Sequence, residues 1–398
     1  MRFLKASLVV ITSLGIGGDS ALRPPSDHGK RIARVERLAE QGVARGYWPG
    51  FMWAEVAPGH IVSVGAAGFA DVEGQEPMTA TTTMPIGSIT KVIVGLSAAQ
   101  AIHDGLLDVT VPLSAFLTIS LDAPDGLPRT FENLATHTSG ILDAEVTYEE
   151  NGYHFGAAKH PVTLSDFLIS YLSKDGPLYD ADANFGSWAP GTRYAYSNIA
   201  AGLAGQAISD ATKRSFANYS MSTVAEPLGL SGFWGHTIEN PVNAATLYSR
   251  SDVGDFRALE PYGIATWPDG QFNASVVDLA TLLATVMNDG VFEGRTIFDP
   301  AVISLLTEPR VSNIEGLTSA GDKIGLFWNE ETLSFGPISL TMLGHNGGDP
   351  GVLTLMYQFP NSENGFVVML NGLPDSTLGE VQLVRIIRLL AEMPNHGG

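Results

Sequence analysis

The sequence predicts an α/β protein in which both ends of the chain build one antiparallel sheet and the middle is a helical insertion. The first part of the chain has the pattern helix, strand, strand, and the last part has three strands and a helix. Between about 89 and 283, apolar residues recur mainly at helical spacing, and loops rich in Gly, Pro, Asp and Thr separate them. Strands at both ends that are joined by short turns indicate one antiparallel sheet.

The N-terminal part of the sheet follows a helix predicted over 31–44, whose apolar residues lie on one face and which ends at Gly46. Two strands are predicted over 51–56 and 61–65, and the Pro58-Gly59 pair between them is typical of a tight turn. These elements supply one helix and the first two strands.

The C-terminal part supplies three more strands. They are predicted over 338–343, 352–359 and 366–370, where residues alternate between apolar and polar or form short apolar runs. The stretch 360–365 is rich in Pro, Asn, Ser and Gly, so we expect a turn between the last two strands. A final helix is predicted over about 378–392.

Composition narrows the classes of function. The chain has 42 acidic and 22 basic residues, a formal net charge of −20. Because nucleic acids and anionic membranes are bound by clustered Lys and Arg, no nucleic-acid partner is expected. The absence of cysteine excludes disulfides, thiolate catalysis and cysteine-ligated zinc. No metal is expected either, because the chain has no His-Glu-x-x-His pattern and its acidic loop at 180–191 lacks the glycine and glutamate of a calcium loop.

The first 21 residues have the pattern of a secretory signal. Arg2 and Lys5 form a basic start, residues 6–16 are apolar, and 18–21 form a small-residue exit. The apolar run is too short to cross a bilayer, and no other stretch is predicted to cross one. The sequence therefore predicts an exported protein, periplasmic or secreted, without stable membrane insertion once the signal is removed. The alternative is an N-terminal helix.

Ser88 precedes Lys91 by three residues, at the start of a segment that is apolar almost all round. Lys91 is the only charged residue from Ser88 through Ile102, so this segment is predicted to be a buried helix. Burial lowers the pKa of a lysine, and residues i and i+3 share a helix face, so Lys91 can accept the Ser88 hydroxyl proton. The Ser88 amide at the helix start can also stabilise an oxyanion. The alternative is a helix cap beside a lysine that reaches the surface.

Tyr196 and Asn198 form a second candidate pair, near the start of an apolar helix predicted over 199–208. A tyrosine there can relay a proton to a leaving group, and an asparagine amide can bind both a lysine and a substrate carbonyl. The alternative is that Tyr196 is a half-buried core residue and Asn198 a helix cap.

A glycine-rich segment over 344–351 follows an alternating strand. Gly347 and Gly348 let the backbone approach a ligand closely, and the Gly348 amide can supply the second half of an oxyanion hole. His345 would then face the substrate. The alternative is a plain hairpin turn.

The order Ser-x-x-Lys, Tyr-x-Asn, His-x-Gly resembles the superfamily of β-lactamases and penicillin-binding proteins, in its class C-like branch. The resemblance runs from about Arg31 to Leu390 and includes the stretches 134–141 and 226–230. It implies a β-lactamase-like fold: an antiparallel five-stranded sheet flanked by helices, an all-helical insertion, and an active site between them. The implied parts are a signal peptide at 1–21, a discontinuous sheet domain at 28–88 and 284–396, and the insertion at 89–283.

The resemblance also implies a role for each candidate residue, and it requires no cofactor. His137, in the stretch 134–141, is expected to be structural. The implied roles are nucleophile for Ser88, base for Lys91, proton relay for Tyr196, contact to lysine and substrate for Asn198, and substrate or oxyanion binding for His345, Gly347 and Gly348.

One residue departs from the β-lactamase pattern. His345 stands where β-lactamases have the lysine of Lys-Thr-Gly, whose charge helps to hold the antibiotic carboxylate. A neutral imidazole holds a carboxylate poorly at pH 7, so an efficient β-lactamase is not expected. The sequence favours an esterase-like serine hydrolase of small-molecule esters, amides or peptides. The alternatives are a D,D-carboxypeptidase or D-aminopeptidase, a weak β-lactamase, and a non-catalytic penicillin-binding-like sensor. Oligomeric state is not predicted.

Overall fold

The computed structural model describes residues 28–391 except 239–240, 252–253, 318, 320, 336–337, 361 and 375. The predicted signal at 1–21 lies outside the described residues. Within the described part, no helix is both long and apolar enough to cross a membrane.

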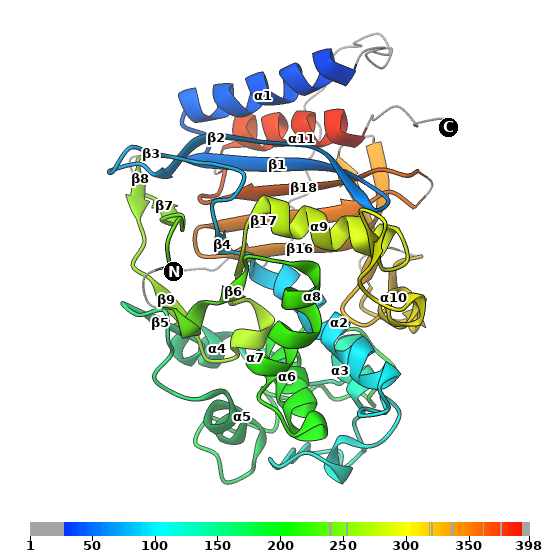
Figure 1. Cartoon of the computed structure of the whole chain (residues 1–398). Coiled ribbons are helices and arrows are strands. Elements are labelled where there is room, and N and C mark those ends of the chain that lie inside the picture. The colour runs from blue at the N-terminus through cyan, green and yellow to red at the C-terminus, as the bar shows by residue number, and fades with distance from the viewer. Residues whose placement is uncertain are drawn as a thin grey trace.

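The centre of the molecule is one antiparallel sheet in the order β13-β14-β15-β16-β17-β18-β1-β2-β3 (Figure 1). All five predicted strands are present, as β1, β2, β16, β17 and β18, which confirms the α/β class. The predicted number of five strands is wrong, because the sheet has nine. The strand bounds are β1 Gly50–Ala57, β2 His60–Asp71, β3 Glu76–Pro77, β13 Val311–Ser312, β14 Lys323–Ile324, β15 Asn329–Phe335, β16 Ile338–Asp349, β17 Val352–Gln358 and β18 Gly365–Leu370.

The four additional strands lie at the two edges of the sheet. Three of them, β3, β13 and β14, are two residues long, too short for any alternating pattern to develop. The fourth, β15, begins with a polar run, so its pairing with β16 has no hydrophobic signature.

The two ends of the chain meet in the middle of the sheet, where β1 pairs with β18 from Phe51↔Leu370 onward. Every residue of β1 is buried. Phe51 and Trp53 belong to the core beneath α1 (His28–Ala44) and α11 (Thr377–Ala391), while Met52 and Ala54 face the opposite core. Because neighbouring side chains on a strand point to opposite faces, a strand between two cores is mainly apolar. The one acid of β1, the buried Glu55, forms an ion pair with Arg31 of α1.

On the opposite face of the sheet, α9 (Val276–Met287) packs against β1, β17 and β18 (Figure 1). The predicted boundary at residue 283 falls inside this helix. The helix α10 (Pro300–Thr307) packs against α2 (Thr90–His103), which leads into the helical half of the molecule.

The segment 89–283 is mainly helical but contains short strands, so the prediction of an all-helical insertion is wrong in detail. These strands have two or three residues each, below the length at which a period of two can be recognised. The helices are α3 Phe131–Ala135, α4 Glu145–Asn151, α5 Leu164–Leu172, α6 Asn198–Thr212, α7 Phe216–Ser220 and α8 Glu226–Leu228; the strands here and nearby are β4 Met84–Pro85, β5 Tyr153–Phe155, β6 Phe233–Trp234, β7 Tyr248–Arg250, β8 Phe256–Ala258, β9 Tyr262–Ile264, β10 Phe272–Ala274, β11 Val291–Phe292 and β12 Arg295–Thr296.

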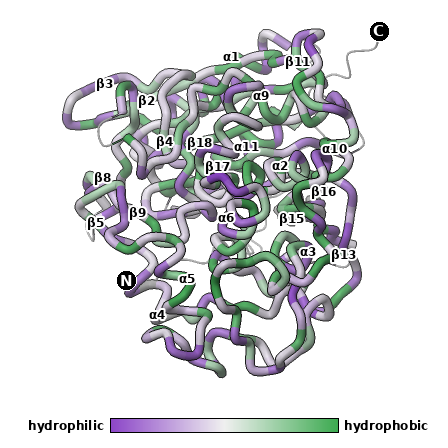
Figure 2. The backbone as a smooth tube through the Cα atoms, turned by 60° about the horizontal axis from the view of Figure 1, so that its bottom comes forward, coloured by the Kyte–Doolittle hydropathy of each residue, from purple (hydrophilic) through white to green (hydrophobic). Residues whose placement is uncertain are grey.

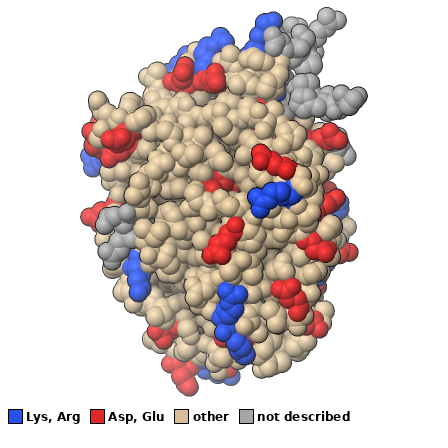
Figure 3. Space-filling view, viewed as in Figure 1, with Lys and Arg blue, Asp and Glu red and all other residues tan. Residues whose placement is uncertain are grey.

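The surface is polar at its outer turns. The β2–β3 turn projects from the sheet and is hydrophilic in Figure 2. On the face drawn in Figure 3, basic side chains lie interspersed with acidic ones.

Candidate active site

Ser88 and Lys91 lie at the junction of the sheet with the helical half. Ser88 is in the single turn η1 (Gly87–Ile89), which continues directly into α2. The Lys91 Nζ atom lies 3.0 Å from Ser88 Oγ, as the i, i+3 spacing predicts. Gly87 has φ +54, and a Cβ there would lie 3.0 Å from the Gly348 amide nitrogen. The turn therefore needs glycine both for its backbone angle and for its contact with β16.

The Lys91 amine has three hydrogen-bond partners. Nζ donates to Asn198 Oδ1 and to the Asp269 carbonyl oxygen, both at 2.8 Å, and contacts the Ser88 hydroxyl at 3.0 Å. The amide oxygen and the carbonyl can only accept, whereas a hydroxyl can donate or accept. An unprotonated amine can therefore keep both donated bonds and turn its lone pair toward Ser88.

Burial sets the protonation of Lys91, which is fully inaccessible to solvent. Desolvation lowers its pKa below the ordinary 10.5, although the carboxylates of Asp269, Asp349 and Asp143 oppose this shift. Because desolvation prevails, a larger fraction of Lys91 is in the uncharged amine form than in an exposed lysine at the same pH.

Tyr196 approaches Ser88 from the other side. Its hydroxyl donates to Ser88 Oγ at 2.8 Å, and its ring centroid lies 5.0 Å from Lys91 Nζ. Tyr196 as a residue is 37% exposed, and its ring centroid lies 4.3 Å from that of His137. Desolvation raises the pKa of Tyr196 above its usual value of 10, so the phenol is neutral and can donate its proton.

We expect Tyr196→Phe to lower kcat by about 10–100-fold while leaving the fold intact. The ring and its contact with His137 are retained, and only the hydroxyl that contacts Ser88 is lost. Steady-state kinetics beside a thermal melt would measure both effects. A wild-type kcat in this variant would remove Tyr196 from the proton path.

Asn198 is held by the first turn of α6. Ser197 caps this helix, and the Asp143 carboxylate accepts hydrogen bonds from Ser197 Oγ, the Asn198 amide and the Ile199 amide at 2.8–3.0 Å. Asp143 was not among the site residues predicted from the sequence. The sequence gives no sign of this role, because an acid that caps a helix from 55 positions away leaves no local pattern.

The glycine-rich end of β16 touches η1. A Cβ on Gly347 would lie 3.0 Å from the Ser88 amide nitrogen, just as one on Gly87 would lie 3.0 Å from the Gly348 nitrogen. The structure thus brings the two amides predicted for an oxyanion hole to the same point, and Gly348 is exposed there.

His345 is 3% exposed and lies 6.4 Å from the Tyr196 ring, centroid to centroid. Burial lowers the pKa of His345 to about 4, and the Lys91 charge acts in the same direction. The imidazole is therefore uncharged at neutral pH. Nδ1 is hydrogen-bonded to the Asn346 carbonyl oxygen, while Nε2 has no hydrogen-bond partner among the described residues.

His137 is buried behind Tyr196 and has φ +55, a left-handed backbone that few non-glycine residues adopt. Its Nδ1 accepts a hydrogen bond from the Ser197 amide at 3.2 Å. Desolvation lowers its pKa well below 6.5, which keeps the ring neutral. His137 therefore supports Tyr196 and the start of α6 from behind.

Two further acids lie near Lys91: Asp269, which is buried, and Asp349, which is half-buried. Asp269 accepts hydrogen bonds from Tyr148 and Thr266, and Asp349 accepts one from Tyr153. Burial raises the pKa of Asp269 to about 7 and of Asp349 to about 6, although Lys91 acts to lower both. Neither acid was predicted from the sequence, because only the fold brings Asp269, in the turn 267–269, near Asp349 at the end of β16.

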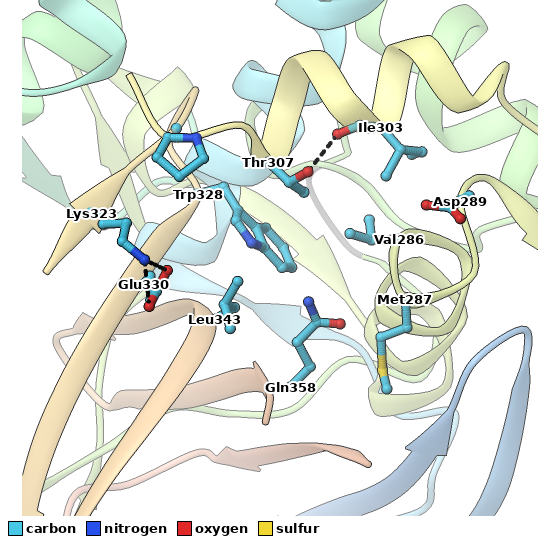
Figure 4. A pocket seen from close by; sticks show the side chains of 12 residues that line it. Val286, Met287, Asp289, Ile303, Thr307, Lys323, Trp328, Glu330, Leu343 and Gln358 are labelled. Atoms are coloured by element: carbon cyan, nitrogen blue, oxygen red, sulfur yellow. Dashed lines mark hydrogen bonds and ion pairs between the residues drawn. The ribbon is translucent and has the colours of Figure 1, made fainter. Parts of the chain in front are cut away.

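The cavity of about 320 Å³ drawn in Figure 4 lies elsewhere, between α9, α10 and strands β14–β17. Trp328 and Gln358 line it, and the Lys323–Glu330 ion pair, at 2.8 Å, stands at its side. None of the sequence candidates lines this cavity. Among the described residues, no group of three or more His, Asp or Glu is placed to hold a metal ion.

The sheet with its helical half, and a Ser-Lys-Tyr cluster at their junction, are the arrangement expected of the β-lactamase superfamily. A family model described as Beta-lactamase matches residues 35–390, and the chain belongs to this family.

Known relatives are distant. The chain is 24% identical over 325 residues to an N-acetylmuramyl-L-alanine amidase of Bacillus subtilis, covering 71% of this chain and 69% of that protein. It is 28% identical over 218 residues to esterase EstB of Burkholderia gladioli, covering about half (51%) of each.

Two solved structures show the same fold. The octameric penicillin-binding protein homologue of Pyrococcus abyssi superposes with a TM-score of 0.69 at 22% identity, covering 90% of this chain and 77% of that one. The D-amino acid amidase of Ochrobactrum anthropi SV3 also has a TM-score of 0.69, at 19% identity, covering 91% and 99%.

Proposed function

We propose that the protein is a serine hydrolase that cleaves small esters or amides through an acyl-enzyme on Ser88, without a cofactor. One observation carries this proposal: Ser88 Oγ is contacted at once by Lys91 Nζ at 3.0 Å and by Tyr196 OH at 2.8 Å, beside the Gly348 amide. A serine in a helix cap needs neither contact. Relatives named as an amidase and an esterase support the reaction class.

In the acylation step, Ser88 Oγ attacks the substrate carbonyl carbon and its proton passes to Lys91 Nζ. The carbonyl oxygen becomes an oxyanion, which the amides of Ser88 and Gly348 stabilise. When the bond to the leaving group breaks, Tyr196 delivers a proton to the departing oxygen or nitrogen and is reprotonated from Lys91. The products of this step are the acyl-enzyme and a free alcohol or amine.

Deacylation repeats the sequence with water as the nucleophile. Water loses a proton toward Tyr196 and Lys91 and attacks the acyl carbon, and the Ser88 oxygen leaves with that proton. Asn198 keeps Lys91 oriented through both steps by accepting its hydrogen bond. Each turnover restores the starting protonation state.

The charges of the site disfavour substrates with a carboxylate beside the scissile bond. Lys91 is engaged in the proton path, and His345 is neutral with a pKa of about 4. The carboxyl groups of Asp143, Asp269 and Asp349 are close enough to act on Lys91, and none of them can attract a substrate carboxylate. We therefore place the protein with esterases and amidases, not with efficient β-lactamases or D,D-carboxypeptidases. We further propose that it acts outside the cytoplasm, on the pattern of its first 21 residues.

The test is steady-state hydrolysis of a chromogenic short-chain ester and a chromogenic cephalosporin, with Ser88→Ala as the matched control. We expect multiple turnovers of the ester, at least about 10³-fold slower in the Ser88→Ala variant, and little turnover of the cephalosporin. Mass spectrometry of the quenched reaction should show the acyl group on the Ser88 peptide. A stable adduct without turnover would instead identify a sensor.

A further inference from the structure

We propose that Asp349 binds a protonated amino group on the acyl part of the substrate, so that the preferred substrates are aminoacyl esters or amides. This inference rests on the proposed function, because it concerns the acyl group transferred to Ser88.

Asp349 is placed beside the reacting carbonyl. It directly follows Gly348, whose amide is the proposed oxyanion donor, and consecutive Cα atoms are about 3.8 Å apart. Across the site, its Oδ2 would lie 3.0 Å from a Cβ on Gly270. Gly270 in turn follows Asp269, whose carbonyl accepts the Lys91 hydrogen bond. The carboxylate therefore lies between the oxyanion donor and the loop that holds the base.

The hydrogen bonding of Asp349 is incomplete. Tyr153 donates to Oδ1 at 2.6 Å, and no group in the described part of the chain donates to Oδ2. The structural acids of this protein differ: Asp278 accepts four hydrogen bonds from the amides and hydroxyls of Ser231 and Ser275. A half-buried carboxylate with a free oxygen is a ready acceptor for a charged donor.

The surrounding charge favours a cation. Asp269 is close enough to raise the pKa of Lys91 by its charge, as are Asp349 and Asp143. Lys91 is the basic group that acts on both Asp269 and Asp349. Desolvation lowers the pKa of Lys91, which favours its uncharged form. A substrate ammonium would supply the positive charge that the site lacks.

Aromatic rings extend from the same carboxylate. Tyr153 packs against Tyr262 at 5.8 Å, and Tyr262 packs against Phe155 at 5.5 Å, centroid to centroid. Phe155 is 37% exposed. The partly exposed Tyr153 and the exposed Phe155 offer an apolar surface for a substrate side chain, and aromatic faces can attract an ammonium.

The test compares phenylalanine p-nitroanilide, as both enantiomers, with 3-phenylpropanoyl p-nitroanilide, which lacks only the amino group. We expect the wild type to prefer one amino-bearing enantiomer at least about tenfold in kcat/KM. In Asp349→Asn, which keeps the shape of the side chain, this ratio should fall at least about tenfold. The matched control is Asp175→Asn, which removes the charge of an exposed acid after α5 and should leave the ratio within about twofold.

A binding measurement on the wild type covers the case in which Asp349→Asn does not fold. We expect 2-phenylethylamine to inhibit ester hydrolysis competitively at least about tenfold more strongly than 2-phenylethanol. Equal kcat/KM for all three anilides, or equal inhibition by amine and alcohol, would overturn the inference while ester turnover upheld the proposed function. If ester and anilides are all inert, the proposed function fails and this inference fails with it.

Discussion

Replacing Lys91 by alanine is expected to lower kcat/KM for ester hydrolysis by about 10³–10⁴-fold, a larger loss than for Tyr196→Phe. Lys91 is the basic side chain that contacts Ser88 Oγ, and its removal leaves the hydroxyl without a proton acceptor. Asn198 Oδ1 and the Asp269 carbonyl lose their donor as well. The initial rate of acylation, followed by mass spectrometry, measures the loss directly.

Two controls separate chemistry from folding in this variant. Circular dichroism and a thermal melt should show an intact fold. Added ethylamine should restore part of the rate, because the missing side chain leaves space for a small amine beside Ser88. A wild-type rate in Lys91→Ala, or an intact variant that no amine rescues, would contradict the assignment of Lys91 as the base.

The pH dependence of the wild-type enzyme should follow from the same residue. Only the unprotonated amine accepts the Ser88 proton, so kcat/KM is expected to fall as the pH is lowered through the pKa of Lys91. Because desolvation brings that pKa below 10.5, the rate should rise with pH and level off before pH 10.5.

Replacing Gly347 by alanine is expected to damage both the catalytic turn and the stability. A Cβ there would lie 2.2 Å from the Ile86 carbonyl oxygen and 3.0 Å from the Ser88 amide nitrogen. Backbone atoms cannot give way as a flexible side chain can, so β16 must move from η1. We expect a loss of about 1–3 kcal/mol in unfolding free energy and about 10²–10³-fold in kcat as the two amides separate.

The matched control for this change is Gly105→Ala. This is the same glycine-to-alanine change at a residue with φ +70, but a Cβ there would meet no atom within 4 Å. We expect a cost of about 1–2 kcal/mol from backbone strain and a normal kcat. Chemical denaturation and steady-state kinetics compare the two variants. Full activity in Gly347→Ala would show that the tight contact between β16 and η1 is not needed.

The fold was largely predictable because its central strands carry strong patterns. The runs that became β1, β17 and β18 are mainly apolar on both faces, and a strand between two helical layers favours that composition. The edge strands were not predictable, because β13 pairs only with β14, and β14 joins the sheet through β15, over two residues each.

The site was predictable where its residues are neighbours in sequence. Ser88 and Lys91 share one helical turn, and the structure brings Tyr196, Asn198 and Gly348 to them. Asp143, Asp269 and Asp349 were missed. Each is a single acid whose position near Lys91 depends on how several elements pack, and a charge without a periodic context does not reveal its partner.

The pairing of β1 with β18 also governs how the protein must be made. These neighbours in the sheet are separated by roughly 300 residues in the chain. At a synthesis rate of about 5–20 residues per second, β1 waits about 15–60 s for its partner, with the edge that pairs with β18 left open. No N-terminal fragment can close the sheet, so the nascent chain needs shielding from aggregation until its last strand has emerged.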